Sequence, residues 1–180
     1  TLFPYTTLFR SPTNNNSMQF HKEGRIIDLS PDQTHERPAT ADDWKILPMA
    51  GHHKTISLSL EFTGDQFRQI TSGHIPQEME DKWFIYWDGE FLNFHRSWTG
   101  HCIYRLKIRQ EGDIYCGREL RIVTDESIMA ATSEEREVEM LLFIVGAVLL
   151  DDEAMRLSFI ERFKQTHPPE LWGGFGNLLF

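Results

Sequence analysis

The sequence predicts an α+β fold, in which an antiparallel meander sheet of about five strands carries C-terminal helices packed on one face. Three observations support this prediction. Residues 55–62 alternate between apolar and polar side chains, which is typical of a half-buried strand. Residues 82–125 contain four segments separated by turn signals, as antiparallel strands do. Residues 140–150 are apolar throughout and follow the strands, which indicates a helix that covers one face of the sheet.

A short helix is expected directly after the first strand. Thr63 and Gln66 have the spacing of a capping box, in which each residue satisfies a backbone N–H of the other. Gly73 then supplies a stop signal. The helix should therefore span residues 64–72.

Three turn signals divide the next segment. Asp88-Gly89 is the strongest short hairpin signal. Ser97-Trp98-Thr99, followed by Gly100, suits a three-residue loop, and so does Glu111-Gly112-Asp113. These turns separate four predicted strands: residues 83–87, 90–95, 101–109 and 114–123.

The turn lengths also predict which residues pair. A two-residue turn at Asp88-Gly89 places Ile85 opposite Leu92, and the next loop places Phe94 opposite Cys102. In this register one face of the sheet is apolar, includes Cys102 and packs against the apolar helix. The other face carries rings, amides and cations: Tyr86, Phe91, Asn93, His95, His101, Arg105, Lys107 and Arg109.

Two C-terminal helices are predicted. Ser133 and the acids after it open the first, because carboxylates are favourable at the positive end of a helix. Its apolar part, residues 140–150, has about half of the roughly 20 residues that a membrane span needs, so we expect a buried helix and no membrane association. The second helix begins at Asp151 or Asp152 and ends before Pro168-Pro169.

Composition narrows the class of protein. The 180 residues are 40% hydrophobic and 25% charged, which excludes a collagen-like chain, a wholly disordered chain and a coiled-coil rod. With 18 Lys and Arg against 27 Asp and Glu, the net charge is −9. Nucleic acid is therefore not an expected partner, because binding it depends on phosphate neutralisation by basic groups. Two cysteines are too few for a disulfide framework, and reduced thiols are typical of a cytoplasmic protein.

The chain divides into three parts. Residues 1–11 resemble, letter for letter, a translated sequencing adapter, so we expect them to be an artefact that contributes nothing to folding. Residues 12–41 are polar and broken by prolines, which predicts a flexible N-terminal arm, although an apolar patch at 26–29 could add a short strand. Residues 42–180 are expected to form a single α+β domain with an apolar C-terminal tail.

The candidate binding residues surround the second predicted turn, at residues 95–101. In a chain of net charge −9, residues 97–109 hold three cations and no acid. An exposed Trp98 would be costly without a ligand, which favours a loop where the indole stacks on a ring while Arg and His hold an anionic group. Alternatively, Trp98 folds back onto the sheet and Arg96 pairs with an acid. The candidate set is His95, Arg96, Trp98, His101 and Arg105.

Other chemistry has weaker support. His95 and His101 should be cross-strand neighbours, but no third ligand falls at metal-binding spacing, so no metal or other cofactor is predicted. Cys102 follows His101 in a strand, and neighbouring side chains point to opposite faces, which argues against a thiol–imidazole pair. Cys116 is expected near Ile108, on the order of 20 Å from Cys102, so the two thiols should not form a disulfide.

A resemblance adds one expectation. Residues 81–86, the string His-Arg-Ser-Trp-Thr-Gly at 95–100 and residues 102–104 resemble a group of small uncharacterised bacterial proteins. Some of these lie beside or within ADP-ribosylglycohydrolase-type proteins. The resemblance covers roughly residues 55–123 and implies a bacterial origin and a nucleotide-linked context. It carries no catalytic residues over to this chain.

Three functions are compatible with these observations. The leading hypothesis is a cytoplasmic binding or accessory module, whose basic and aromatic hairpin face contacts a protein partner or an anionic ligand such as a nucleotide. The alternative is a hydrolase of nucleotide or ADP-ribosyl substrates, with His95 or His101 as general base and Arg96 and Arg105 holding phosphate. A third is a structural protein that docks a partner through its apolar tail. The sequence leaves open whether the protein is an enzyme.

Overall fold

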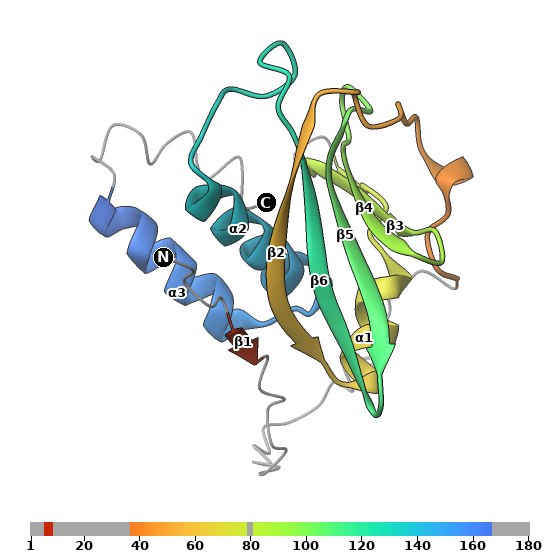
Figure 1. Ribbon diagram of the computed structural model, residues 1–180, viewed down its shortest axis with the longest axis vertical. Coiled ribbons are helices and arrows are strands. Elements are labelled where there is room, and N and C mark those ends of the chain that lie inside the picture. The colour runs from red at the N-terminus through yellow and green to blue at the C-terminus, as the bar shows by residue number, and fades with distance from the viewer. Residues whose placement is uncertain (1–5, 9–36, 79–80, 167–180) are drawn as a thin grey trace, which may run out of the picture.

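A six-stranded sheet forms the centre of the molecule, with strand order β1-β2-β6-β5-β4-β3 (Figure 1). The computed structural model describes residues 6–8, 37–78 and 81–166. Strands β2 to β6 pair antiparallel with their neighbours, while β1 adds in parallel to β2. The predicted α+β fold with an antiparallel meander is therefore confirmed. The strands are β1 (Thr6–Leu8), β2 (His53–Phe62), β3 (Trp83–Trp87), β4 (Phe91–Arg96), β5 (Cys102–Glu111) and β6 (Ile114–Val123).

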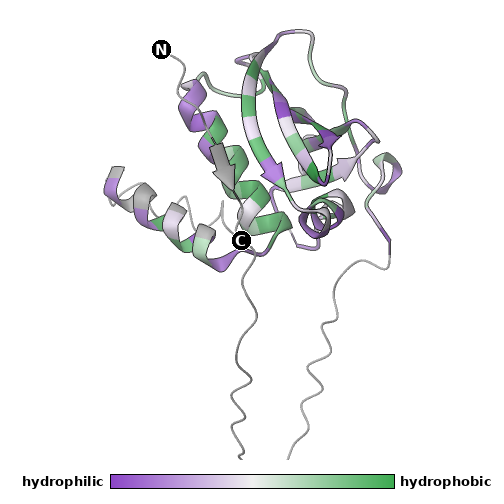
Figure 2. Cartoon of the chain, turned by 60° about the horizontal axis from the view of Figure 1, so that its bottom comes forward, coloured by the Kyte–Doolittle hydropathy of each residue, from purple (hydrophilic) through white to green (hydrophobic). Residues whose placement is uncertain are grey.

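Helices cover one face of this sheet (Figure 1). They are α1 (Gly64–Ser72), α2 (Glu134–Phe143), its π-helical continuation η2 (Ile144–Leu149) and α3 (Glu153–Thr166); a 3-10 turn, η1 (Ala41–Asp43), precedes β2. Hydrophobic residues line the side of α2 that faces the sheet (Figure 2). The core forms between Leu106 and Leu120 of the sheet and Val138, Leu141 and Ile144 of the helices. No helix in the described part of the chain is long and apolar enough to cross a membrane.

The signals for α1 act as the sequence predicts. The Thr63 hydroxyl accepts a hydrogen bond from the Gln66 N–H at 3.2 Å, and the Gln66 side chain accepts from the Thr63 N–H at 2.9 Å. Gly73 ends the helix with φ +74°, and a Cβ there would lie 2.3 Å from the Ile85 carbonyl oxygen. Only glycine fits this position, because both the backbone angle and the space exclude a side chain.

The first hairpin differs from the predicted register by two residues. Ile85 pairs with Phe94, and Trp87 pairs with Leu92. The reason is that the two-residue turn lies one residue later, at Gly89-Glu90. The Asp88 N–H donates to the Phe91 carbonyl at 3.1 Å, and the Asp88 carboxylate accepts the N–H groups of both Glu90 and Phe91. Because side chains alternate with period two, this shift leaves every residue on its expected face.

A β-bulge in β5 places Cys102 on the opposite face of the sheet from the predicted one. Phe94 pairs with Tyr104 but His95 pairs with Cys102, so Ile103 is an extra residue on β5. Cys102 therefore lies on the same face as His95, and the prediction that it belongs to the helix-covered face is wrong. The expected pairing of His95 with His101 is wrong for the same reason, by one residue.

The third turn is shorter than predicted. Glu111 pairs with Ile114, so the loop holds only Gly112 and Asp113, with Gly112 at φ +64°. The shorter turn places Cys116 opposite Arg109, one residue from the predicted position near Ile108, and a second irregularity in the β5–β6 pairing follows between Lys107 and Ile108.

The N-terminal part has more contacts than its composition suggests. Ala39 is buried, and its N–H donates to the Ser72 carbonyl at 2.8 Å. Within the segment that resembles an adapter, Thr6–Leu8 pair with residues 59–61 of β2. The patch at 26–29 and the tail after residue 166 lie outside the described residues.

Candidate functional site

The turn between β4 and β5 is a tightly bonded hairpin tip. The Arg96 N–H donates to the His101 carbonyl at 2.9 Å, and the Gly100 N–H donates to the Arg96 carbonyl at 2.7 Å. Gly100 has φ +81°, and a Cβ there would lie 2.8 Å from the Lys45 carbonyl oxygen. The predicted loop of three residues followed by glycine is therefore present, and the glycine also allows residues 44–47 to approach.

Two other segments anchor this tip. The Trp44 indole N–H donates to the Ser97 carbonyl at 2.8 Å, and the Ser97 hydroxyl donates to the Asp81 carbonyl at 2.6 Å. The Leu47 N–H donates to the Gly100 carbonyl at 2.8 Å. The tip is thus held from both sides by chain segments that are distant in sequence.

Trp98 stands out from this anchored tip. Its side chain is 64% exposed, and the Lys82 ammonium lies 4.7 Å from the centre of the indole ring. Trp98 does not fold back onto the sheet as a hydrophobic plug. The tip therefore presents a large ring and a cation together at the surface.

Arg96 lies on the opposite side of the sheet from His95 and Arg105. It pairs with Trp83 across β3 and β4, and its guanidinium lies 4.2 Å from the Trp83 ring centre. Burial lowers the pKa of Arg96, whereas nearby Tyr104 and Glu137 act in the opposite direction. Its charge is therefore directed toward the helix-covered side rather than toward the exposed Trp98.

His95 is buried, with 2% of its surface exposed. Its Nδ1 lies 2.9 Å from the Gly100 carbonyl oxygen. Because a carbonyl only accepts, Nδ1 carries the proton and the imidazole is held in one tautomer. Burial lowers the pKa of His95, and the Tyr86 ring stacks on it at 5.7 Å. These contacts hold the neutral ring inside the structure, where a substrate does not reach it.

Arg105 belongs to a polar network on the sheet face. Its Nε donates to the Asn93 amide oxygen at 2.8 Å, and another guanidinium nitrogen lies 3.1 Å from the Asp88 carboxylate. The Asn93 amide nitrogen donates to the same carboxylate at 2.9 Å. Arg105 is therefore engaged by internal partners, which reduces its availability to a phosphate.

Three cations of this face surround Phe91, and each of the three is paired with an acid. Arg105, Lys107 and Arg121 lie 4.2, 5.2 and 4.6 Å from the Phe91 ring centre. Their carboxylate partners come from the first turn and from β6: Asp88 for Arg105, Glu90 for Lys107 and Glu119 for Arg121. The sequence segment 97–109 is basic, but two of its three cations, Arg105 and Lys107, form ion pairs with acids that lie outside it.

The thiols and potential metal ligands show no reactive arrangement. Both cysteines are free and buried, and burial raises the pKa of Cys102 to about 12. A thiol with so high a pKa is a poor nucleophile at neutral pH. No group of three or more potential metal ligands occurs within residues 37–78 and 81–166.

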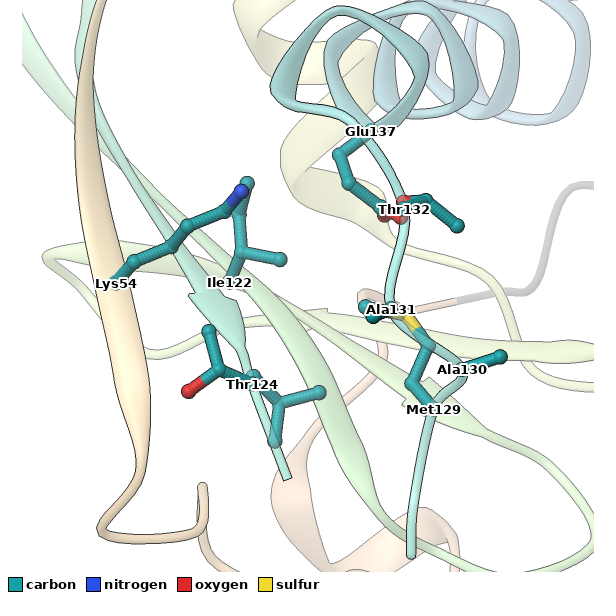
Figure 3. Close-up of a pocket in the computed structure, with 9 residues that line it drawn as sticks. Lys54, Ile122, Thr124, Met129, Ala130, Ala131, Thr132 and Glu137 are labelled. Carbon is teal, nitrogen blue, oxygen red and sulfur yellow. The ribbon is translucent and has the colours of Figure 1, made fainter. Parts of the chain in front are cut away.

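Glu137 is a residue that the sequence analysis did not select. It is 5% exposed although it lies in the first turn of α2 beside exposed Glu134 and Glu135. Its carboxylate accepts hydrogen bonds from the hydroxyls of Tyr104 and Thr132. A cavity of about 90 Å³ adjoins it, between the edge of the sheet and the loop before α2 (Figure 3). A sequence feature could have identified Glu137 as buried. Its helical spacing with the apolar Val138 and Leu141 places its side chain on the buried side of the helix.

No protein-family model matches the chain, and no curated protein or solved structure is significantly similar to it.

The five candidate residues do not form one site. Trp98 lies at the tip with Lys82, and the His101 backbone pairs there with Leu47. His95 and Arg105 are held inside the sheet face, and Arg96 faces the helices. Among the five candidate residues, those at the tip alone offer an exposed surface with the expected combination of ring and cation.

Proposed function

We propose that the protein is a binding module that docks a protein partner through its hairpin tip, with Trp98 inserted into a pocket of the partner. The observation that carries this proposal is the exposure of Trp98, 64%, on a loop anchored by Trp44, Asp81 and Leu47. Tryptophan dominates the binding energy of many interfaces. A loop that is already ordered loses little conformational entropy when it binds.

The charges near the tip favour an acidic rim on the partner. Lys82 lies over the Trp98 ring, with its ammonium 4.7 Å from the ring centre. The chain as a whole is acidic, so a local positive surface would orient a partner that carries carboxylates around an apolar pocket. The association rate should then fall as salt concentration rises. A cytoplasmic location is part of the proposal, and the two free thiols support it.

A nucleotide-like ligand at the same tip is the second candidate. The exposed indole of Trp98 favours it, because a base can stack on such a ring. The phosphate of such a ligand would lie beside Lys82. Arg105 is less available to it, because Asp88 and Asn93 already bind the guanidinium. The hydrolase hypothesis has less support, because His95 is buried and its Nδ1 is bound to Gly100.

The test compares Trp98→Ala with Ile114→Ala, an exposed residue at the opposite end of the sheet. Proteins captured from the source cells by the wild-type chain are identified, purified and titrated against all three chains. We expect one partner whose affinity falls at least about 30-fold with Trp98→Ala, the effect of losing about 2 kcal/mol at an interface hot spot. Ile114→Ala should bind it as the wild type does.

Two results would count against the proposal. A partner that binds both variants equally would show that the tip is not the interface. Calorimetric binding of ADP-ribose that is lost in Trp98→Ala, with no protein partner, would favour the second candidate instead.

A further inference from the structure

The cavity beside Glu137 is separate from the hairpin tip and has polar groups on two sides. Its walls come from β2, the end of β6, the loop before α2 and α2 itself (Figure 3). The lining is apolar at Ile122, Ala130 and Ala131 and polar at Lys54, Thr132 and Glu137. The volume of about 90 Å³ holds more than one water but less than benzene, which fits an engineered cavity of about 150 Å³.

Glu137 places a negative charge at the inner end of this cavity. Both carboxylate oxygens act as acceptors, one from Tyr104 and one from Thr132. A carboxylate has about four acceptor positions, so two remain after these bonds. Burial, followed by the charge of Glu137, raises the pKa of Tyr104, so its hydroxyl remains a donor. The carboxylate is therefore held in place and can accept further hydrogen bonds from a donor in the cavity.

Lys54 supplies a positive charge at the opposite wall. Its ammonium is partly exposed and lies 3.6 Å from the carboxylate of Glu134, which is itself largely exposed. Figure 3 shows the side chains of Lys54 and Glu137 extending from β2 and α2 toward the space between them. An ion pair with an exposed glutamate is weak, so Lys54 can exchange that partner for a ligand carboxylate at small cost.

These charges determine the class of ligand. We propose that the cavity binds a small zwitterionic α-amino acid, with its ammonium group on Glu137 and its carboxylate on Lys54. A ligand with a single charge would engage only one of these two side chains. The cavity volume restricts the side chain to the smallest ones, and the methyl groups of Ala130 and Ala131 fit an apolar one.

The test is an NMR titration of the full chain with glycine and with L-alanine, following the amide signals of Ala130, Ala131 and Thr132. We expect saturable shifts in the millimolar range. Acetate, ethylammonium and L-leucine should bind at least tenfold more weakly, the first two for lack of one charge and the third for size. Trp98→Ala should bind glycine as the wild type does, because the proposed function concerns a different surface.

Two variants test whether Lys54 and Glu137 bind the charged groups of glycine. Lys54→Met and Glu137→Gln should each weaken glycine binding at least tenfold. Lys107→Met is the matched control, because Lys107 pairs with Glu90 on the other face of the sheet, and it should leave binding unchanged. If Glu137→Gln does not fold, Lys54→Met decides the test. Shifts that do not saturate, equal affinity in Lys54→Met, or ethylammonium binding as tight as glycine would each overturn the proposal.

Discussion

The imidazole of His95 donates from Nδ1 to the carbonyl oxygen of Gly100 over 2.9 Å, which ties a buried ring of the sheet to the hairpin tip. The same carbonyl accepts from the Leu47 N–H at 2.8 Å. The conformation of Gly100 therefore affects the sheet face, the tip and the segment before β2 together.

Replacing Gly100 with alanine should destabilise the protein more than replacing Gly112. Both glycines have positive φ, which costs an alanine about 1–2 kcal/mol. A Cβ at Gly100 would also lie 2.8 Å from the Lys45 carbonyl oxygen, whereas nothing lies within 4 Å at Gly112. We expect Gly100→Ala to cost about 1–3 kcal/mol more than Gly112→Ala, measured by urea unfolding. Equal losses would show that residues 44–47 can move away from the tip.

The pH dependence of stability should change when His95 is replaced by asparagine, which keeps a donor near Nδ1 but does not titrate. Burial lowers the pKa of His95 below its usual 6.5. Below pH 6.5 the unfolded chain therefore binds a proton that the folded chain does not. The stability that wild type derives from neutral His95 is complete above pH 6.5 and is lost as pH falls toward the folded pKa.

The measurement is the free energy of unfolding of both chains between pH 5 and 8. The wild type should lose stability relative to His95→Asn as pH falls, by at most about 1.4 kcal/mol per pH unit. Parallel curves would contradict the inferred neutral state of the ring.

The fold was predictable where the signals are local. Thr63, Gln66 and Gly73 define α1 through contacts within a few residues, and the sequence predicts its bounds correctly. The extra residue Ile103 in β5 has no such local cause, because a bulge depends on how two strands fit together. That is why the face of Cys102 was predicted wrongly.

The site was predictable only in part, because its electrostatics depend on pairs that form between strands. The charged residues of segment 97–109 are all cations, yet Asp88 and Glu90 from outside this segment form ion pairs with Arg105 and Lys107. Likewise, the anchoring of the tip depends on Trp44, which is 53 residues away from Ser97 in sequence. A pattern read along one segment does not contain these partners.

Arg105 should contribute to stability rather than to ligand binding. Burial tends to raise the pKa of Asp88, but hydrogen bonds from Phe91 and Asn93 outweigh it and the pKa is lowered. Asp88→Asn should therefore cost about 1–3 kcal/mol above pH 4, with the difference shrinking as pH falls through the folded pKa. A double-mutant cycle with Arg105→Met should give a coupling of about 0.5–1 kcal/mol, because the pair is partly exposed. A coupling of zero, with ADP-ribose binding lost in Arg105→Met, would restore Arg105 as a phosphate ligand.

Removing residues 1–17 tests the segment that resembles an adapter. Its described part, Thr6–Leu8, adds three residues in parallel to the edge of β2. We expect the unfolding temperature to stay within about 2 °C of that of the full chain, because pairing this short at an edge contributes little. A decrease of several degrees would show that β1 is part of the stable sheet.

Trp98→Ala and Trp83→Ala should differ strongly in stability. Trp83 is buried against Tyr104 and Arg96, so its removal should cost about 3–5 kcal/mol. Trp98 is 64% exposed, and its contact with Lys82 is a surface cation–π pair worth about 0.5–1 kcal/mol. Trp98→Ala should therefore cost less than about 1 kcal/mol in the free energy of unfolding, measured from denaturant curves of both variants. A loss of 3 kcal/mol or more at Trp98 would mean that the indole supports the fold, and the tip would then have to be regarded as a structural element.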